Sequence, residues 1–94
     1  MNIPKQIKIG GLMYSIEKSD NMERANALGM CIPDECIIKI KKSMPHQKQC
    51  VILLHEIVHA IDFACNYGRM KDDVVDRFSE VLYQVIVDNR GMKW

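Results

Sequence analysis

The sequence predicts a small α+β domain in which an antiparallel sheet made of two hairpins packs on two C-terminal helices. Three observations favour this fold class. Residues 1–42 contain short runs of alternating polar and apolar residues, separated by turn signals. Residues 43–66 contain a long, mostly apolar segment that begins near a proline and ends before a glycine. Residues 72–89 repeat apolar side chains three and four positions apart, which is typical of an amphipathic helix.

Composition and charge restrict the class of protein. The chain has 94 residues, 48% of them hydrophobic, and a net charge of +1. This length fits one domain, residues 1–94. The small charge favours neither a nucleic-acid partner nor a membrane partner. No apolar run approaches the ~18 residues of a membrane span, and the N-terminus lacks the apolar core of a signal peptide. We therefore expect a cytoplasmic protein.

The four cysteines are expected to be reduced thiols in that compartment. Structural zinc sites usually contain pairs of cysteines two residues apart, and no pair here has that spacing. Free cysteine also behaves as a small core residue. We therefore interpret Cys31, Cys36, Cys50 and Cys65 as unpaired side chains rather than as a zinc knuckle.

Two hairpins are expected in the first half. The first joins residues 5–9 to residues 12–17 through a Gly-Gly turn, and the second joins residues 28–32 to residues 36–41 through Pro-Asp-Glu. Residues 18–27 between them form a loop or a short helical turn. Isoleucines alternate with lysines in residues 36–41. This strand should have one buried face, and its lysines are typical of a sheet edge.

Two helices are expected in the second half. Ser43 can cap the first, Pro45 is tolerated in its first turn, and Gly68 supplies a left-handed end. The second helix starts at Asp72 or Asp73 and reaches about Asn89, followed by a tail. Its apolar stripe consists of Val74, Val75, Phe78, Val81, Leu82, Val85 and Ile86.

The most informative motif is His-Glu-Ile-Val-His at positions 55–59, inside the first helix. Residues 51–65 are otherwise apolar apart from Asp62. His55 and His59 lie one helical turn apart on one face and can bind one metal ion, and Glu56 can reach a water beside it. The pattern predicts a Zn²⁺ site with His55 and His59 as ligands. A bound zinc ion acidifies water and polarises a carbonyl group, and Glu56 is placed to act as the general base for that water.

A catalytic zinc needs a third protein ligand, and four candidates compete: Asp62, Cys65, Asp76 and Glu80. Asp62 lies on the same helix and more easily supports a ligand than becomes one. Cys65 has the offset of one zinc-peptidase class, but that class needs glycine at position 62. A second helix packed antiparallel on the first brings Glu80 back beside residues 55–59, and glutamate reaches further than Asp76. Glu80 lies nearly opposite the apolar stripe, so all four remain open on these arguments.

The motif at residues 55–59, followed 21 positions later by Glu80, resembles the gluzincin clan of zinc metallopeptidases. Residues 53–62 and 80–85 in so short a chain look like the small zinc-peptidase-like proteins of phages and prophages. The minigluzincins are similar in plan, and the resemblance covers chiefly residues 50–89. It implies a minimal zincin-like domain with hairpins in residues 1–42, an active-site helix at 43–66 and a third-ligand helix at 72–89.

The resemblance also implies site roles. His55, His59 and Glu80 would bind Zn²⁺, and Glu56 would be the general base. A peptide or protein substrate would lie along an edge strand before the active helix, and residues 36–41 are the candidate. Larger gluzincins place an aspartate four residues after the glutamate ligand to orient the first histidine, whereas this chain has Gln84. Asp62 and Asp76 are the candidates to replace that aspartate.

The favoured function is therefore zinc-dependent endopeptidase activity. The alternative is a metal-stabilised interaction or regulatory protein of phage origin with little or no turnover, because a short chain gains much from a structural metal. A closed four-ligand site would indicate this alternative, and an open site would indicate the enzyme. An oxyanion stabiliser is also expected, for which the sequence offers Tyr67, Tyr83, His46 and Arg69 without a preference.

Overall fold

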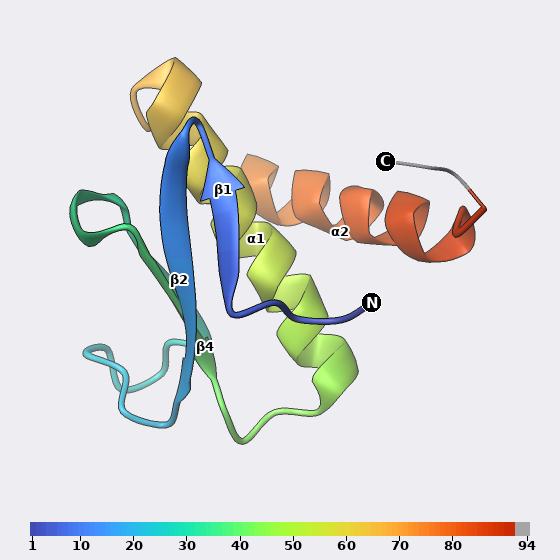
Figure 1. Cartoon of the computed structure of the whole chain (residues 1–94), viewed down its shortest axis with the longest axis horizontal. Coiled ribbons are helices and arrows are strands. Elements are labelled where there is room, and N and C mark those ends of the chain that lie inside the picture. The colour runs from blue at the N-terminus through green and yellow to red at the C-terminus, as the bar shows by residue number, and fades with distance from the viewer. Residues whose placement is uncertain (92–94) are drawn as a thin grey trace.

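The computed structural model describes residues 1–91, and it confirms the α+β class. The strands are β1 (Gln6–Ile9), β2 (Leu12–Ser19), β3 (Gly29–Ile32) and β4 (Ile37–Lys41), with a 3₁₀ turn, Pro33–Glu35, between the last two. They precede α1 (His46–Asn66) and α2 (Asp72–Asp88) (Figure 1). Most of the expected tail, residues 92–94, lies outside the described residues.

The sheet contains both predicted hairpins, but they meet through a parallel pair. Its strand order is β1-β2-β4-β3. The pairs β1–β2 and β3–β4 are antiparallel, as expected, whereas β2 and β4 run parallel from Ser15↔Ile37 to Ser19↔Lys41. A parallel neighbour requires a crossover connection. Here residues 20–36, which include β3, form that crossover, and the sheet is mixed rather than wholly antiparallel.

The prediction that residues 36–41 form an edge strand is wrong. β4 lies between β2 and β3, so both of its edges are paired. Its isoleucines, Ile38 and Ile40, are completely buried against α1. The alternating lysines therefore occupy the other face of the sheet, which the period-2 geometry of a strand separates from the core. The edge strands are β1 and β3.

Helix α1 covers one face of the sheet and also contacts α2 (Figure 1). The main core consists of side chains from both layers: Ile9, Tyr14, Ile38, Ile40, Leu53 and Ala60. Pro45 occupies the N-cap position, so Ser43 lies two residues before it and does not cap the helix. The backbone N–H of Ser43 donates to Asp20 Oδ1 at 3.0 Å. The left-handed end begins at Tyr67, one residue before the predicted Gly68, and both have positive φ.

Helix α2 contacts α1 through a narrower surface than its apolar stripe predicted. Only Val75 and Ser79 of α2 are buried. Phe78 and Val81, in the middle of that stripe, are 59% and 60% exposed. The face of α2 that meets α1 therefore includes positions 72, 75, 76 and 79, which carry acidic residues as well as Val75. No helix among residues 1–91 is both long enough and apolar enough to span a membrane.

Candidate metal centre

The middle of α1 brings His55, Glu56 and His59 together, with one potential ligand atom from each lying within 4.8 Å of the others. The Nε2 atoms of the two histidines are 3.1 Å apart. With Zn–N bonds of about 2.0–2.1 Å, that separation corresponds to an N–Zn–N angle of roughly 100°, close to tetrahedral. The cluster can therefore hold a metal ion, and its histidine geometry fits zinc.

Asp76 of α2 orients the first histidine. Its Oδ1 lies 2.9 Å from His55 Nδ1. When this carboxylate accepts a hydrogen bond from Nδ1–H, the proton is fixed on Nδ1 and the lone pair of Nε2 faces His59. Asp76 was one of two residues predicted to replace the missing aspartate at Gln84. Asp76 therefore contacts the nitrogen of His55 opposite the one that faces His59.

A second aspartate of α2 approaches the other histidine, and sequence analysis did not identify it. Asp72 Oδ1 lies 3.8 Å from His59 Nε2. The sequence does contain a pattern that indicates this contact: Asp72 and Asp76 are four residues apart, as His55 and His59 are. In an antiparallel helix pair, two i,i+4 pairs on facing sides come into register. Asp72 therefore lies on the metal-binding side of His59.

Glu80, the sequence-predicted third ligand, lies one helical turn beyond Asp76. The antiparallel register sets position 72 near His59 and position 76 near His55, so position 80 falls level with Val51 and Ile52. Glu80 is exposed and lines a neighbouring hollow of about 280 Å³ that His55, Glu56 and Asp76 also line. It is therefore adjacent to the cluster without belonging to it, and its role as a ligand stays a prediction.

The other two ligand candidates occupy different positions. Cys65 is exposed in the last turn of α1. Asp62 is 2% exposed. Its carboxylate accepts hydrogen bonds from the Asn66 side chain at 2.8 Å and from the Met70 backbone N–H at 3.1 Å. Asp62 thus links the end of α1 to the loop that leads into α2.

Glu56 is buried, at 6% exposure, yet its carboxylate faces the site. Among the described residues, none donates a hydrogen bond to it and no cation pairs with it. Burial, followed by the negative charges of Asp72 and Asp76, raises the pKa of Glu56 to about 7. A nearby divalent cation lowers the pKa of a carboxyl group. Metal binding would therefore favour the ionised form that a general base requires.

The same environment lowers the pKa of His59 and raises the pKa of Cys31. Burial, and then the neighbouring His55, lower the pKa of His59, which favours the neutral, metal-binding imidazole. Burial, and then the charge of Glu56, raise the pKa of Cys31 to about 12. Cys31 therefore lines the site as a neutral thiol.

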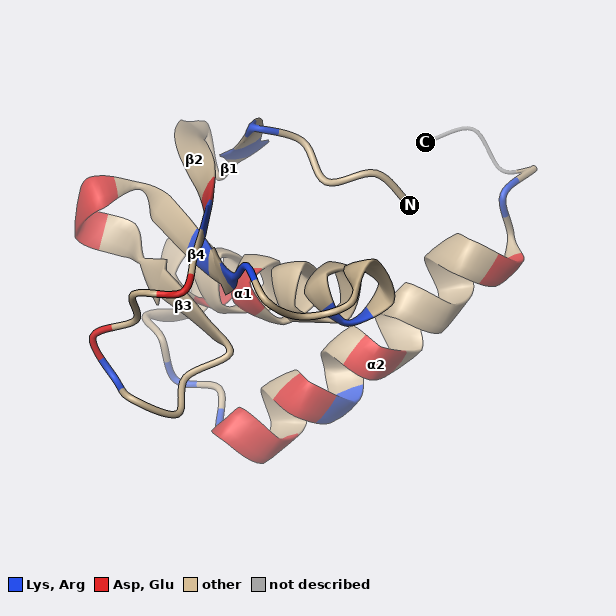
Figure 2. Ribbon diagram, turned by 90° about the horizontal axis from the view of Figure 1, so that it is seen from below, with Lys and Arg blue, Asp and Glu red and all other residues tan. Residues whose placement is uncertain are grey.

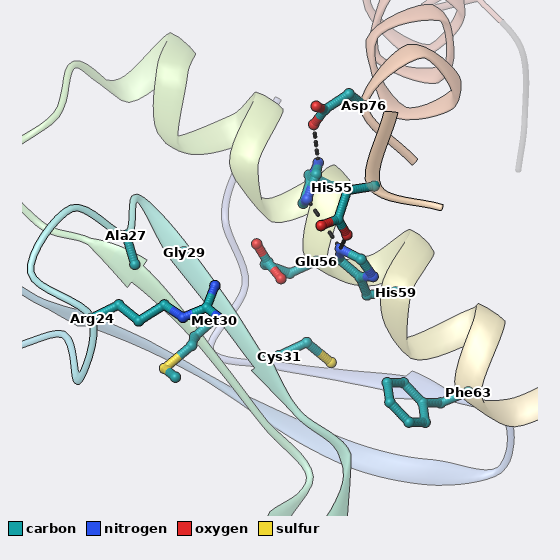
Figure 3. Close-up of a pocket in the computed structure, with 11 residues that line it drawn as sticks. Arg24, Ala27, Gly29, Met30, Cys31, His55, Glu56, His59, Phe63 and Asp76 are labelled. Carbon is teal, nitrogen blue, oxygen red and sulfur yellow. Dashed lines mark hydrogen bonds and ion pairs between the residues drawn. The ribbon is translucent and has the colours of Figure 1, made fainter. Parts of the chain in front are cut away.

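The site opens into a cavity of about 510 Å³ (Figure 3). One wall comes from α1, a second from the first turns of α2, and a third from β3 with the loop before it. The lining side chains of this third wall include Arg24, Ala27, Met30 and Cys31. An open cavity on the metal-binding side of two histidines leaves room for a ligand that the protein does not supply.

The third wall is an edge strand whose backbone faces the cavity. Lys41 N–H donates to Leu28 O at 2.9 Å, so Leu28 and Lys41 form a hydrogen-bonded pair. Because such pairs alternate along an antiparallel ladder, the N–H and C=O groups of Gly29 and Cys31 point away from β4. Gly29 also allows the close approach of Glu56. A Cβ built on it would lie 2.9 Å from Glu56 Oε2 and 2.5 Å from Ile52 Cγ2.

No protein-family model, curated protein or solved structure is significantly similar to this chain. None of the four oxyanion candidates lines the main cavity. Tyr67 is 83% exposed, with the Arg69 guanidinium 5.0 Å from its ring, and His46 lies 2.8 Å from Met1 O at the start of α1. Tyr83 lies on α2 beyond Glu80, nearly one turn further from the histidines.

Proposed function

We propose that this protein is a zinc-dependent endopeptidase of the gluzincin type. The observation that carries the proposal is Glu56, a residue only 6% exposed whose carboxylate has no partner among the described residues and borders the cavity beside two converging histidine nitrogens. A purely structural metal site has no use for such a group, and burying it costs free energy. The proposal assigns His55 and His59 as zinc ligands and Glu56 as general base. Glu80 of α2 is proposed as the third ligand, with Asp72 as the competing carboxylate.

The substrate is proposed to bind along β3 rather than along β4, because β4 is internal in the sheet. β3 is an edge strand beside the cavity, and the backbone groups of Gly29 and Cys31 are directed outward from the sheet. An extended peptide can add to such an edge through main-chain hydrogen bonds. Strand addition there would bring a peptide carbonyl past Glu56, because Gly29 and Glu56 are in close contact.

In the proposed reaction, the metal ion and the side chains of the protein have separate roles. When bound, zinc would supply a Lewis acid that polarises the scissile carbonyl group and acidifies water. Asp76 keeps the His55 proton on Nδ1, so that Nε2 is free to bind. Glu56 removes a proton from the attacking water and then passes it to the leaving amine as the C–N bond breaks.

A second function is supported by the size of the chain. Only Val75 and Ser79 of α2 are buried, so a metal bridging α1 and α2 would add much to their association. A protein that kept the site for stability alone would be an interaction or regulatory protein with little turnover. The open cavity and the Glu56 carboxylate favour the enzyme over this alternative.

One matched pair of variants tests the proposal. We expect the zinc-loaded protein to cleave a quenched-fluorescence peptide library, and Glu56→Gln to retain one zinc per chain while losing cleavage. Glu35→Gln is the control, because it makes the same change in the 3₁₀ turn between β3 and β4, and Glu35 does not line the cavity. If Glu56→Gln cleaves as fast as the parent, or if the parent binds zinc and cleaves no peptide, the endopeptidase assignment is wrong.

A further inference from the structure

We propose that Arg24 binds a carboxylate of the substrate, so that the favoured peptides carry an acidic side chain or a free C-terminal carboxylate near the scissile bond. This inference rests on the proposed function and names the substrate class that the site selects. Arg24 belongs to the loop before β3, and its side chain extends along that strand into the cavity (Figure 3).

Among the described residues, Arg24 is the one lysine or arginine that lines the cavity, and the proposed chemistry leaves it unused. The other charged lining residues are Glu56, Asp72 and Asp76. Glu56 is the proposed base, Asp76 holds His55, and Asp72 lies beside His59. The close contacts between acidic and basic side chains among the described residues are His55–Asp76, His59–Asp72 and Arg77–Asp73, and none includes Arg24. Its guanidinium group is therefore available to a ligand.

The distribution of charge in the cavity favours a carboxylate at Arg24. Acidic residues follow one another along α2, as Figure 2 shows, and Asp72 and Asp76 form the wall opposite Arg24. A substrate carboxylate would be repelled from that wall and attracted to the guanidinium group. The planar guanidinium group also matches a carboxylate with two parallel hydrogen bonds, which makes it more selective than an ammonium group.

The position of Arg24 allows two sources for this carboxylate. A second hollow of about 490 Å³ adjoins the cavity, and its lining contains Arg24, Ala27 and Gly29 in common with it. Arg24 therefore stands where the two hollows meet. A peptide that continues into the second hollow would present an acidic side chain to Arg24, whereas a peptide that ends there would present its C-terminal carboxylate.

The test uses the zinc-loaded full chain and N-acetylated hexapeptides. In one series, a single Glu or Gln is moved through each position of a peptide amide. In the other, the Gln peptide has a free or an amidated C-terminus. We expect the acidic member of at least one pair to have a kcat/KM roughly 5-fold higher, mainly through KM. This preference should shrink as salt is added.

Two variants separate Arg24 from the general charge of the protein. Arg24→Gln should make the acidic and neutral peptides equivalent. Arg69→Gln removes the same charge from the residue beside Tyr67, outside the cavity, and should keep the preference. A parent enzyme that cleaves both members of every pair equally, or an Arg24→Gln enzyme that keeps the preference, would overturn the proposal and leave the endopeptidase function standing.

Binding measurements keep the test valid if no peptide is cleaved. Fluorescence anisotropy with zinc-loaded Glu56→Gln protein and labelled hexapeptides gives Kd without turnover. A lower Kd for the acidic peptide, abolished in Glu56→Gln/Arg24→Gln, supports carboxylate recognition even where the endopeptidase assignment fails. Equal Kd values for acidic and neutral peptides contradict it.

Discussion

The carboxylate of Asp76 lies 2.9 Å from Nδ1 of His55, and this contact comes from a residue four positions before Glu80. In the larger gluzincins, which the motif resembles, the orienting aspartate stands four positions after the glutamate ligand. Here the aspartate beside the first histidine stands eight positions, about two helical turns, before residue 84. Asp76 consequently occupies the orienting position although residue 84 is glutamine.

Asp76→Asn should weaken zinc binding by about 10–100-fold, because the amide cannot accept the Nδ1–H bond with a full negative charge. Competition with a fluorescent zinc chelator measures the change. Asp73→Asn is the matched control, since Asp73 is an exposed residue of the same helix turn that pairs only with Arg77. Equal zinc affinities for the two variants would show that the contact with His55 has no effect on the metal.

The third ligand can be assigned by two further variants. Glu80→Ala should lower zinc affinity by at least about 100-fold if Glu80 completes the site, because a ligand and its charge are both removed. Asp72→Asn, near His59, should then have a much smaller effect. The opposite order would assign the role to Asp72. X-ray absorption at the zinc edge would report whether a carboxylate remains bound.

The stability of the protein with zinc removed by chelation should fall between pH 5 and pH 8 through Glu56. Its folded-state pKa, about 7, is raised from the ordinary 4.5. The unfolded carboxyl therefore ionises first, and the stabilising contribution is lost as pH rises through 7. A shift of this size corresponds to roughly 3 kcal/mol. Urea unfolding measures it.

The comparison variant for that experiment is Glu56→Gln, which should remove the fall in stability. His59 acts in the opposite sense. Its lowered pKa means that its contribution is present above the ordinary 6.5 and is lost as pH falls through the lower folded-state value. Subtracting the Glu56→Gln curve from that of the parent isolates the glutamate. A difference that does not change with pH would contradict the assigned burial of Glu56.

Gly29→Ala should destabilise the protein by about 1–3 kcal/mol, because the added methyl group overlaps Ile52 and the Glu56 carboxylate. It should also reduce kcat more than zinc affinity, since Glu56 is displaced while His55 and His59 are not. Gly91→Ala is the control, because a Cβ there meets no atom within 4 Å. Unchanged stability and kcat in Gly29→Ala would show that β3 and α1 separate easily.

The sequence by itself determined the local structure and the candidate pair of metal-binding histidines. The alternation of residues in 5–17 and 28–41 specified two hairpins, and the spacing of His55 and His59 placed both side chains on one face of a helix. These features depend on periods of two and 3.6 residues, which operate within single elements. For the same reason, α1 and α2 could be bounded to within a few residues from Pro45, Gly68 and Asp72.

Only the tertiary structure decided which elements meet. The lysines of residues 36–41 indicated an edge strand, but β4 is internal because the second hairpin joins β2 through a parallel pair. The apolar stripe of α2 indicated one contact face, but α2 meets α1 along one margin of that stripe, where Val75 is buried beside Asp72 and Asp76. Strand order and helix register arise from contacts between residues far apart in sequence, which no local period records.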